Sequence, residues 1–229
     1  MVYCYRGAYV RNILLSGLSV VLLACGGGGG EFEAPQQPAP EELDALKGVQ
    51  LRVELFAGQD MVVLPITLVV PDSSLAAGEL FKHRDVLLRW TDSIIQFKLE
   101  NRAAEVAWKF PPELRRTAMR SPGAVPDPDR MGQSVMRTPS LETVPDPFRG
   151  NLRTLVGIVG GRLAFVPAAA VFRQPEPGVV EASMMIVVAD ARTGRVVFRS
   201  LAVGEGGSLS YALSAALDDV LPLQIFAPE

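Results

Sequence analysis

The sequence has very little cysteine and histidine. Among 229 residues there are two cysteines and one histidine, and both cysteines, Cys4 and Cys25, lie within the first 25 positions. The rest of the chain has no thiol for a disulfide, a thiolate metal site or a cysteine nucleophile. The single histidine, His83, excludes a metal cluster built from several histidines. It lies between Lys82 and Arg84, and we expect it to be a solvated residue at the start of a helix.

Signatures of common catalytic sites are also missing. The chain contains no Gly-x-Ser-x-Gly, no His-Glu-x-x-His and no Gly-Lys-Ser/Thr, which mark acyl transfer, zinc hydrolysis and P-loop nucleotide binding. The segment 127–132 resembles a calcium loop, but Met131 and Thr138 stand where oxygen ligands are needed, so a proline-rich surface loop is the better interpretation. The charges at 113–116 and 142–149 are interpreted as solvated. We predict no enzyme activity, no metal and no cofactor.

Positive charge is not concentrated anywhere along the sequence. The chain has 22 basic and 25 acidic residues, and Arg6 and Arg11 are the charged residues before position 25. Residues 25–229 therefore carry 20 basic against 25 acidic residues, a formal charge of −5. Binding to phosphate groups draws on a basic patch. We therefore expect no binding to nucleic acid, and binding to anionic lipid headgroups is disfavoured for the same reason.

The N-terminal segment has the organisation of a secretion signal. Two arginines precede an apolar run at 13–24, which at about 1.5 Å per residue spans only ~18 Å of a ~30 Å hydrocarbon layer. A permanent transmembrane helix is therefore the weaker interpretation. The sequence Leu22-Leu23-Ala24-Cys25 resembles the lipobox of bacterial lipoproteins, which implies cleavage after Ala24 and attachment of lipid to Cys25. The alternative is an ordinary signal peptide with a chance cysteine.

A tether is expected to follow the signal. The glycines at 26–30 and the Pro/Gln/Glu tract at 31–40 cannot bury apolar surface. The predicted organisation is a signal peptide at 1–24, a tether at 25–47 and one domain at 48–229. In the sorting pattern that the lipobox resembles, glycine rather than aspartate after the cysteine indicates the periplasmic face of the outer membrane. The lipid on Cys25 would hold the domain at that membrane.

Alternating and fully apolar segments predict strands in the domain. A half-buried strand is expected at 50–56, a strand covered on both faces at 61–70 with a break at Pro65, and a short strand at 105–110 that stops at Pro111-Pro112. Three further strands are expected at 163–172, 181–189 and 195–203. The loop Asp190–Gly194 joins the last two as an antiparallel hairpin, because glycine accepts positive φ.

Periodic apolar spacing predicts helices after a short lead-in helix at 41–46. A helix from position 84 would bury Leu87, Trp90, Ile94 and Phe97. A second helix at 151–159 ends at Gly160-Gly161, and a third at 209–220 follows a turn at 204–207, with Ser208 as its N-cap and Pro222 after its end. The proline-rich stretch 121–147 is expected to be an irregular insertion, functional or mobile. The elements predict an α/β sandwich, a mixed sheet with packed helices.

Three segments carry a resemblance to known families. They are the strand Met61–Pro65, the strand Leu163–Ala168 after a helix and Gly-Gly, and the hairpin Asp190–Phe198 with its Asp-x-x-Thr-Gly pattern. Over residues 50–221 the order of elements resembles the curli-secretion lipoproteins, the penicillin-binding-protein activator lipoproteins and the amino-terminal module of the Tol-Pal periplasmic protein. The resemblance implies a noncatalytic module that docks onto envelope proteins or self-assembles. The chain lacks two long alternating segments for a membrane-crossing hairpin, so a secretion pore is less expected.

The sequence therefore predicts a membrane-tethered lipoprotein that binds or scaffolds another envelope protein. The 121–147 insertion and the exposed rim of the sheet are the candidate contact surfaces. The alternative is a subunit of an envelope assembly or secretion apparatus that forms homo-oligomers. An envelope hydrolase that uses unfamiliar carboxylate chemistry is the third hypothesis.

Overall fold

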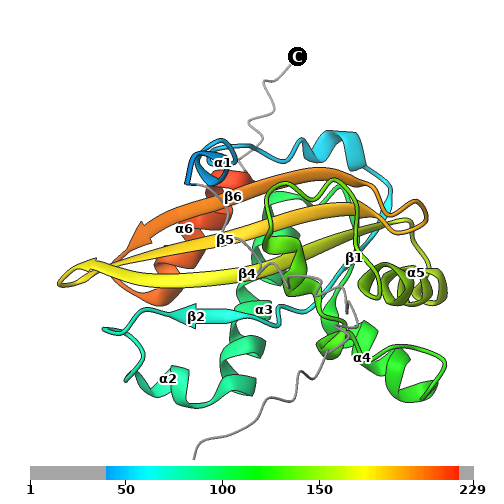
Figure 1. Cartoon of the computed structure of the whole chain (residues 1–229), viewed down its shortest axis with the longest axis horizontal. Helices are drawn as coiled ribbons and strands as arrows, with labels where there is room; N and C mark the ends of the chain where they lie inside the picture. The colour runs from blue at the N-terminus through cyan, green and yellow to red at the C-terminus, as the bar shows by residue number, and fades with distance from the viewer. Residues whose placement is uncertain (1–39, 222–229) are drawn as a thin grey trace, which may run out of the picture. The chain divides into compact units, whose positions relative to one another are not determined.

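The computed structural model describes residues 40–221, so the predicted signal, Ala24, Cys25 and Pro222 lie outside the described residues. A mixed sheet of six strands has the order β3-β1-β4-β5-β6, with β2 also beside β4 (Figure 1). Helices pack on this sheet, which confirms the predicted fold class. Among residues 40–221, no helix has both the length and the apolar character that a membrane span requires.

The strands and helices have the following bounds. The strands are β1 (Asp60–Val63), β2 (Val69–Pro71), β3 (Ala107–Lys109), β4 (Leu163–Glu176), β5 (Val179–Asp190) and β6 (Val196–Gly206). The helices are α1 (Pro40–Asp44), α2 (Glu79–Lys82), α3 (Arg84–Arg102), α4 (Pro111–Arg120), α5 (Phe148–Val159) and α6 (Leu209–Val220), and the 3-10 turns are η1 (Val53–Phe56), η2 (Pro128–Arg130) and η3 (Gln133–Arg137). The long strands β4, β5 and β6 are antiparallel, whereas the shorter strands pair in parallel.

The strand expected at 61–70 is present as two short strands along the same edge of β4. β1 pairs with Leu163–Phe165, and β2 pairs with Ala170–Phe172. The chain leaves the ladder around Pro65, as predicted, because proline has no N–H to donate. Inside β4, by contrast, Pro167 is accommodated by a shift of register between Pro167 and Ala169.

One face of the sheet is covered by the two regular helices α3 and α6. They pack on large side chains of β4 and β5, including Phe165, Phe172, Met184 and Ile186. α6 buries the face that its spacing predicts, which consists of Ala212, Leu213, Ala216, Leu217 and Val220. Ser208 caps this helix as predicted, since its Oγ accepts a hydrogen bond from Tyr211 N at 3.4 Å.

The approach of α6 to β6 depends on Gly204. A Cβ atom at this position would collide with the backbone of Ala216 and lie 2.8 Å from Ala212 O. β6 continues through Gly204 to Gly206, so the turn predicted at 204–207 begins later than expected. Glycine stands here because helix and strand backbones touch, not because the chain turns.

The opposite face of the sheet is covered by α4, α5 and the segment 121–147. The strand side chains on this face are mostly small and include Ala164, Val166, Ala168, Val187 and Ala189. The proline-rich segment packs onto them through Val125, Met131, Met136 and Val144. Only parts of this segment are regular, as predicted, but it forms a layer of the core rather than a projecting insertion. Its apolar side chains are too irregularly spaced among prolines to give a periodic signal.

Three other local predictions differ from the structure. Residues 50–56 do not form a strand: Leu51 N donates to Val220 O at 2.9 Å, and Val53–Phe56 follow as a 3-10 turn. Pro111-Pro112 do more than stop β3, because they open α4 at positions whose N–H groups have no partner within the helix. Residues 40–47, assigned to the tether, contact the domain, since Leu201 N donates to Leu46 O at 3.0 Å.

Candidate functional site

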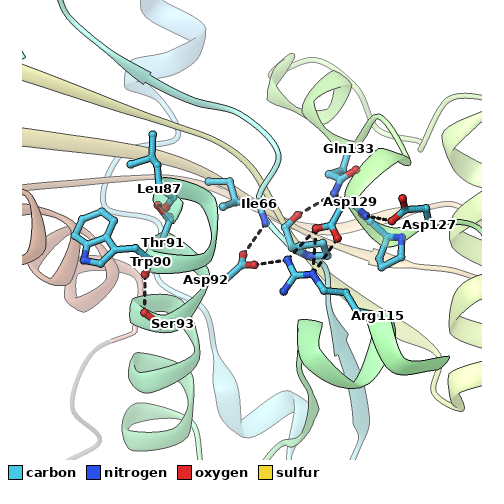
Figure 2. A network of polar contacts seen from close by, with 12 residues as sticks. Ile66, Leu87, Trp90, Thr91, Asp92, Ser93, Arg115, Asp127, Asp129 and Gln133 are labelled. Carbon is cyan, nitrogen blue, oxygen red and sulfur yellow. Dashed lines mark hydrogen bonds and ion pairs between the residues drawn. The ribbon is translucent and has the colours of Figure 1, made fainter. Parts of the chain in front are cut away.

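Buried polar side chains hold the break between β1 and β2 (Figure 2). Ile66 N donates to Asp92 Oδ1 at 2.8 Å, and Gln133 Nε2 donates to Pro65 O at 2.8 Å. Because the chain leaves the sheet here, the N–H of Ile66 and the C=O of Pro65 have no hydrogen-bond partner on a neighbouring strand. Buried backbone groups need such partners. Asp92 from α3 and Gln133 from the 121–147 segment therefore replace the missing strand contacts.

Arg115 of α4 connects this break to a second carboxylate. Its Nη2 donates to Asp92 Oδ2 at 2.8 Å and to Asp129 Oδ1 at 2.8 Å, and its Nε donates to Asp129 Oδ2 at 2.9 Å. Asp127 accepts a hydrogen bond from Asp129 N at 3.0 Å and so orders the turn that carries Asp129. The interpretation of Arg115 as a solvated charge is wrong, because tertiary packing brings both carboxylates to its guanidinium.

Burial raises the pKa of Asp92 to about 6, since lost hydration outweighs the opposing effects of Arg115 and the Ile66 N–H. Hydrogen bonds from Arg115 to Asp129 and then to Asp92 raise the pKa of Arg115, which therefore stays protonated. A buried carboxyl with such a pKa is also found in catalytic acids. Here both carboxyl oxygens of Asp92 already accept hydrogen bonds from protein groups, so Asp92 has a structural role.

The other candidate residues from the sequence have structural or solvent-exposed positions. His83 lies at the start of α3 with its side chain 64% exposed and its Nε2 atom 3.5 Å from Glu79 Oε1, which agrees with a solvated helix end. Asp190 organises the predicted hairpin by accepting hydrogen bonds from Arg192 N and Thr193 N at 2.9 Å. In the part of the chain that the structure describes, no group of His, Cys, Asp or Glu is arranged to hold a metal.

An apolar strip lies on the outer side of α3. Val86 is 57% exposed and Phe97 is 62% exposed. Trp90 lies between them, half-buried, with its ring centroid 6.2 Å from that of Phe172. Positions 86, 90 and 97 share one helix face, because residues three, four and seven apart line up along a helix. We call these three side chains the outer α3 strip.

This strip corrects the predicted orientation of α3 at Phe97, which is exposed. The sequence predicts burial of Leu87, Trp90, Ile94 and Phe97, whereas the buried residues are Leu87, Thr91, Asp92, Ile95 and Leu99. Trp90 and Ile94 do pack against the core, as predicted. Apolar spacing alone missed the rotation because α3 has apolar residues on two sides and buries two polar ones. One of those polar residues, Asp92, faces the core because the break at Ile66 needs an acceptor.

Comparisons with known proteins give similarity to solved structures alone. No family model matches the sequence, and no curated protein matches it. The NMR structure of LpoB from E. coli has a TM-score of 0.36 and 13% identity, covering 89% of this chain and 91% of that one. A lipoprotein from Neisseria meningitidis has a TM-score of 0.35 and 13% identity over 66% and 82% of the two chains.

The C-terminal domain of LpoB from Salmonella enterica has a TM-score of 0.34 and 10% identity, covering 64% of this chain and 82% of that one. LpoB is a penicillin-binding-protein activator lipoprotein, one of the three families that the sequence resembles. The comparisons do not assign this chain to any of the three families. At TM-scores of 0.34–0.36 and 10–13% identity, these similarities assign neither a family nor a role to the chain.

Proposed function

We propose that this protein is a lipid-anchored lipoprotein of the bacterial envelope that binds another envelope protein and has no catalytic role. The anchor is Cys25, exposed by cleavage after Ala24, and the favoured site is the periplasmic face of the outer membrane. The outer α3 strip is the surface for the partner. It takes the place of the 121–147 segment, whose apolar side chains are used in the core.

The outer α3 strip carries the proposal. Single exposed apolar side chains are ordinary on protein surfaces, whereas a row of them along one helix is typical of a docking face. Val86 and Phe97 lie on either side of Trp90 and are about 16 Å apart along the helix axis. Tryptophan is enriched among residues that dominate the free energy of protein association. The strip therefore has the size and chemistry to receive an apolar surface of a partner.

The helix that presents the strip is held rigidly. Ile95 and Leu99 are buried in the core below it. At its C-terminal end, Lys98 Nζ lies 2.7 Å and Arg102 Nη2 lies 2.9 Å from Asp218 Oδ1 of α6. A surface that is already ordered loses less conformational entropy when a partner binds. The hydrolase alternative has no comparable support, because the carboxylates of Asp92 and Asp129 converge on Arg115.

Crosslinking in cells followed by pull-down of the anchored protein tests the docking surface. The double variant Val86→Ser/Phe97→Ser should reduce recovery of the partner at least about thirtyfold, the effect of losing about 2 kcal/mol of binding free energy. The control Met119→Ser/Tyr211→Ser changes two side chains on other helices that are each 73% exposed. Equal recovery with both double variants would contradict the role of the strip.

The same pull-down distinguishes a foreign partner from self-association. A defined second envelope protein in the detergent-solubilised complex supports the docking module. Large complexes that contain copies of this chain alone would instead favour the self-oligomerising subunit. Sizing of the solubilised complex together with its subunit composition separates the two outcomes.

The anchor has its own test. Replacing Cys25 with Ser removes the thiol that would receive the lipid, so acylation should be abolished and the protein should move from membranes to the soluble fraction. Metabolic labelling with a fatty acid and membrane fractionation measure the two effects. Unchanged retention of the unacylated variant in membranes would contradict the lipoprotein assignment.

A further inference from the structure

Five arginines that are far apart in the sequence meet at one end of the sheet. Arg149 and Arg153 lie on α5, Arg162 lies in the connection to β4, and Arg192 and Arg195 lie in the turn between β5 and β6. All five are exposed. α5 and the β5–β6 turn lie at the same end of the sheet, at the right of Figure 1. We call these five side chains the basic end.

Specific contacts bring the basic end together. Arg162 Nε donates to Asp190 Oδ2 at 2.7 Å, and Ala191 N donates to Arg162 O at 2.9 Å. On the other side of the turn, a Cβ atom at Gly194 would lie 2.8 Å from Arg149 Nε. Gly194 also has a φ of 79°, a left-handed backbone conformation that favours glycine in the turn. The β5–β6 turn thus folds against α5.

The basic end differs in charge from the rest of the protein. Three carboxylates lie in these segments or in the stretch just before α5, namely Asp190, Asp146 and Glu142. Five arginines against three carboxylates give this end a charge of +2. Since residues 25–229 carry −5 in total, the remainder carries −7. An anionic surface therefore attracts the protein through this end and repels the remainder.

Most guanidinium groups of the basic end are available for binding. Within residues 40–221, all except that of Arg162 lack an ion pair or side-chain hydrogen bond to another residue. Guanidinium groups bind phosphate oxygens through paired N–H donors. Arginines spread over an open surface suit the headgroups of a membrane better than a single enclosed ligand.

The geometry points to the basic end as a docking surface for an anionic lipid membrane. This inference rests on the proposed anchor at Cys25, which would raise the concentration of the domain near the membrane. Pro40 lies fifteen positions after Cys25, a length of chain that reaches at most roughly 50 Å. Such a tether gives a local concentration on the order of millimolar, at which even a weak contact is occupied. The expectation that anionic headgroups are disfavoured was based on the linear sequence, in which these arginines are not clustered, whereas folding brings them to one end of the sheet.

Cosedimentation with vesicles tests this surface without the lipid. The chain used is 25–229 with Cys25→Ser, and the vesicles contain phosphatidylcholine alone or mixed equally with phosphatidylglycerol. We expect binding to the mixed vesicles at low ionic strength, weakening as salt is added, and none to the neutral vesicles. Arg153→Gln/Arg192→Gln should weaken binding about 25-fold, from about fivefold for each arginine. The control Arg89→Gln/Arg137→Gln removes two exposed arginines elsewhere and should weaken it less than about twofold.

Three results would overturn the inference: equal binding to neutral vesicles, no binding to mixed vesicles, or an equal loss in both double variants. Absence of vesicle binding together with photocrosslinks from position 153 to an acidic protein in cells would assign the basic end to a protein instead. The tested chain carries no lipid, so failure here is separate from failure of the anchor. The anchor is tested separately, by acylation and membrane fractionation of the Cys25→Ser protein at physiological salt. Under these conditions the contact between the basic end and the membrane is too weak to retain a chain that carries no lipid.

Discussion

The two faces of the sheet are covered in different ways. On one face, the regular helices α3 and α6 lie on large strand side chains such as Phe165 and Met184. On the other face, the irregular 121–147 segment lies, beside α4 and α5, on small ones such as Ala164 and Ala189. Helices satisfy their own backbone hydrogen bonds, whereas an irregular segment must find partners for each buried backbone group.

The irregular face meets this requirement with polar side chains from its surroundings. Arg199 of β6 donates to Met136 O at 2.6 Å, Thr138 O at 2.8 Å and Leu141 O at 2.7 Å. Gln133 donates in the other direction, to Pro65 O at 2.8 Å. The helical face depends on shape complementarity, and the irregular face depends on a few polar anchors. The two faces should therefore respond to different substitutions.

The largest effect is expected from adding volume under α6. Gly204→Val would place side-chain atoms inside the backbone of α6, so the free energy of unfolding should fall by more than about 4 kcal/mol. Gly207→Val is the matched control, because a Cβ atom there meets nothing within 4 Å. It should cost less than about 1 kcal/mol. Chemical denaturation measures both, and similar losses would contradict the close approach of α6 to β6.

A smaller effect is expected from removing the main polar anchor of the irregular face. Arg199→Leu leaves three carbonyl groups without their donor, which should lower the free energy of unfolding by about 3 kcal/mol. Amide exchange should accelerate in 121–147 while α6 stays protected. Arg195→Leu, which changes an exposed arginine next to the same strand, should cost less than about 0.5 kcal/mol. Equal loss of protection in both layers would show that they do not unfold separately.

The smallest effect concerns the pH dependence of the junction between the two layers. The pKa of Asp92 is raised from 3.8 to about 6, so the native state binds a proton more tightly than the unfolded state between these pH values. The contribution of Asp92 to stability therefore falls as pH rises from about 4 to about 6. Asp92→Asn removes this titration.

The stability of Asp92→Asn relative to the parent should accordingly improve by on the order of 2 kcal/mol between pH 4 and pH 7. Urea denaturation of both proteins across this range measures the difference and cancels the titration of groups that both share. A difference that stays constant with pH would contradict the raised pKa of Asp92.

Local signals predicted the regular elements well. The spacing of Leu213 and Leu217, the N-cap Ser208 and the glycine of the Asp190–Gly194 loop each lie next to the element that they define. Their effect is therefore visible within a short window of sequence. The same signals failed for 50–56, where the backbone of Leu51 binds the end of α6 instead of a neighbouring strand.

The candidate sites were less predictable because they combine distant segments. The outer α3 strip depends on which side of α3 faces the core, and that rotation depends on Asp92 reaching Ile66, 26 positions away. In the sequence Arg115 is one charged residue among several. In the structure, α3 and the 121–147 segment each place one carboxylate, Asp92 and Asp129, beside its guanidinium. No window of sequence contains these relations.

The sequence by itself determined the α/β class, the helices α5 and α6, the antiparallel hairpin and the break at Pro65, because each follows from backbone chemistry or short-range periodicity. It also carries the sequence Leu22-Leu23-Ala24-Cys25, whose resemblance to a lipobox is the basis of the proposed anchor. Tertiary structure alone decided that the proline-rich segment belongs to the core, that α3 exposes Val86 and Phe97, and that five scattered arginines form one surface. These features arise when segments far apart in the chain satisfy one another's buried polar and apolar groups.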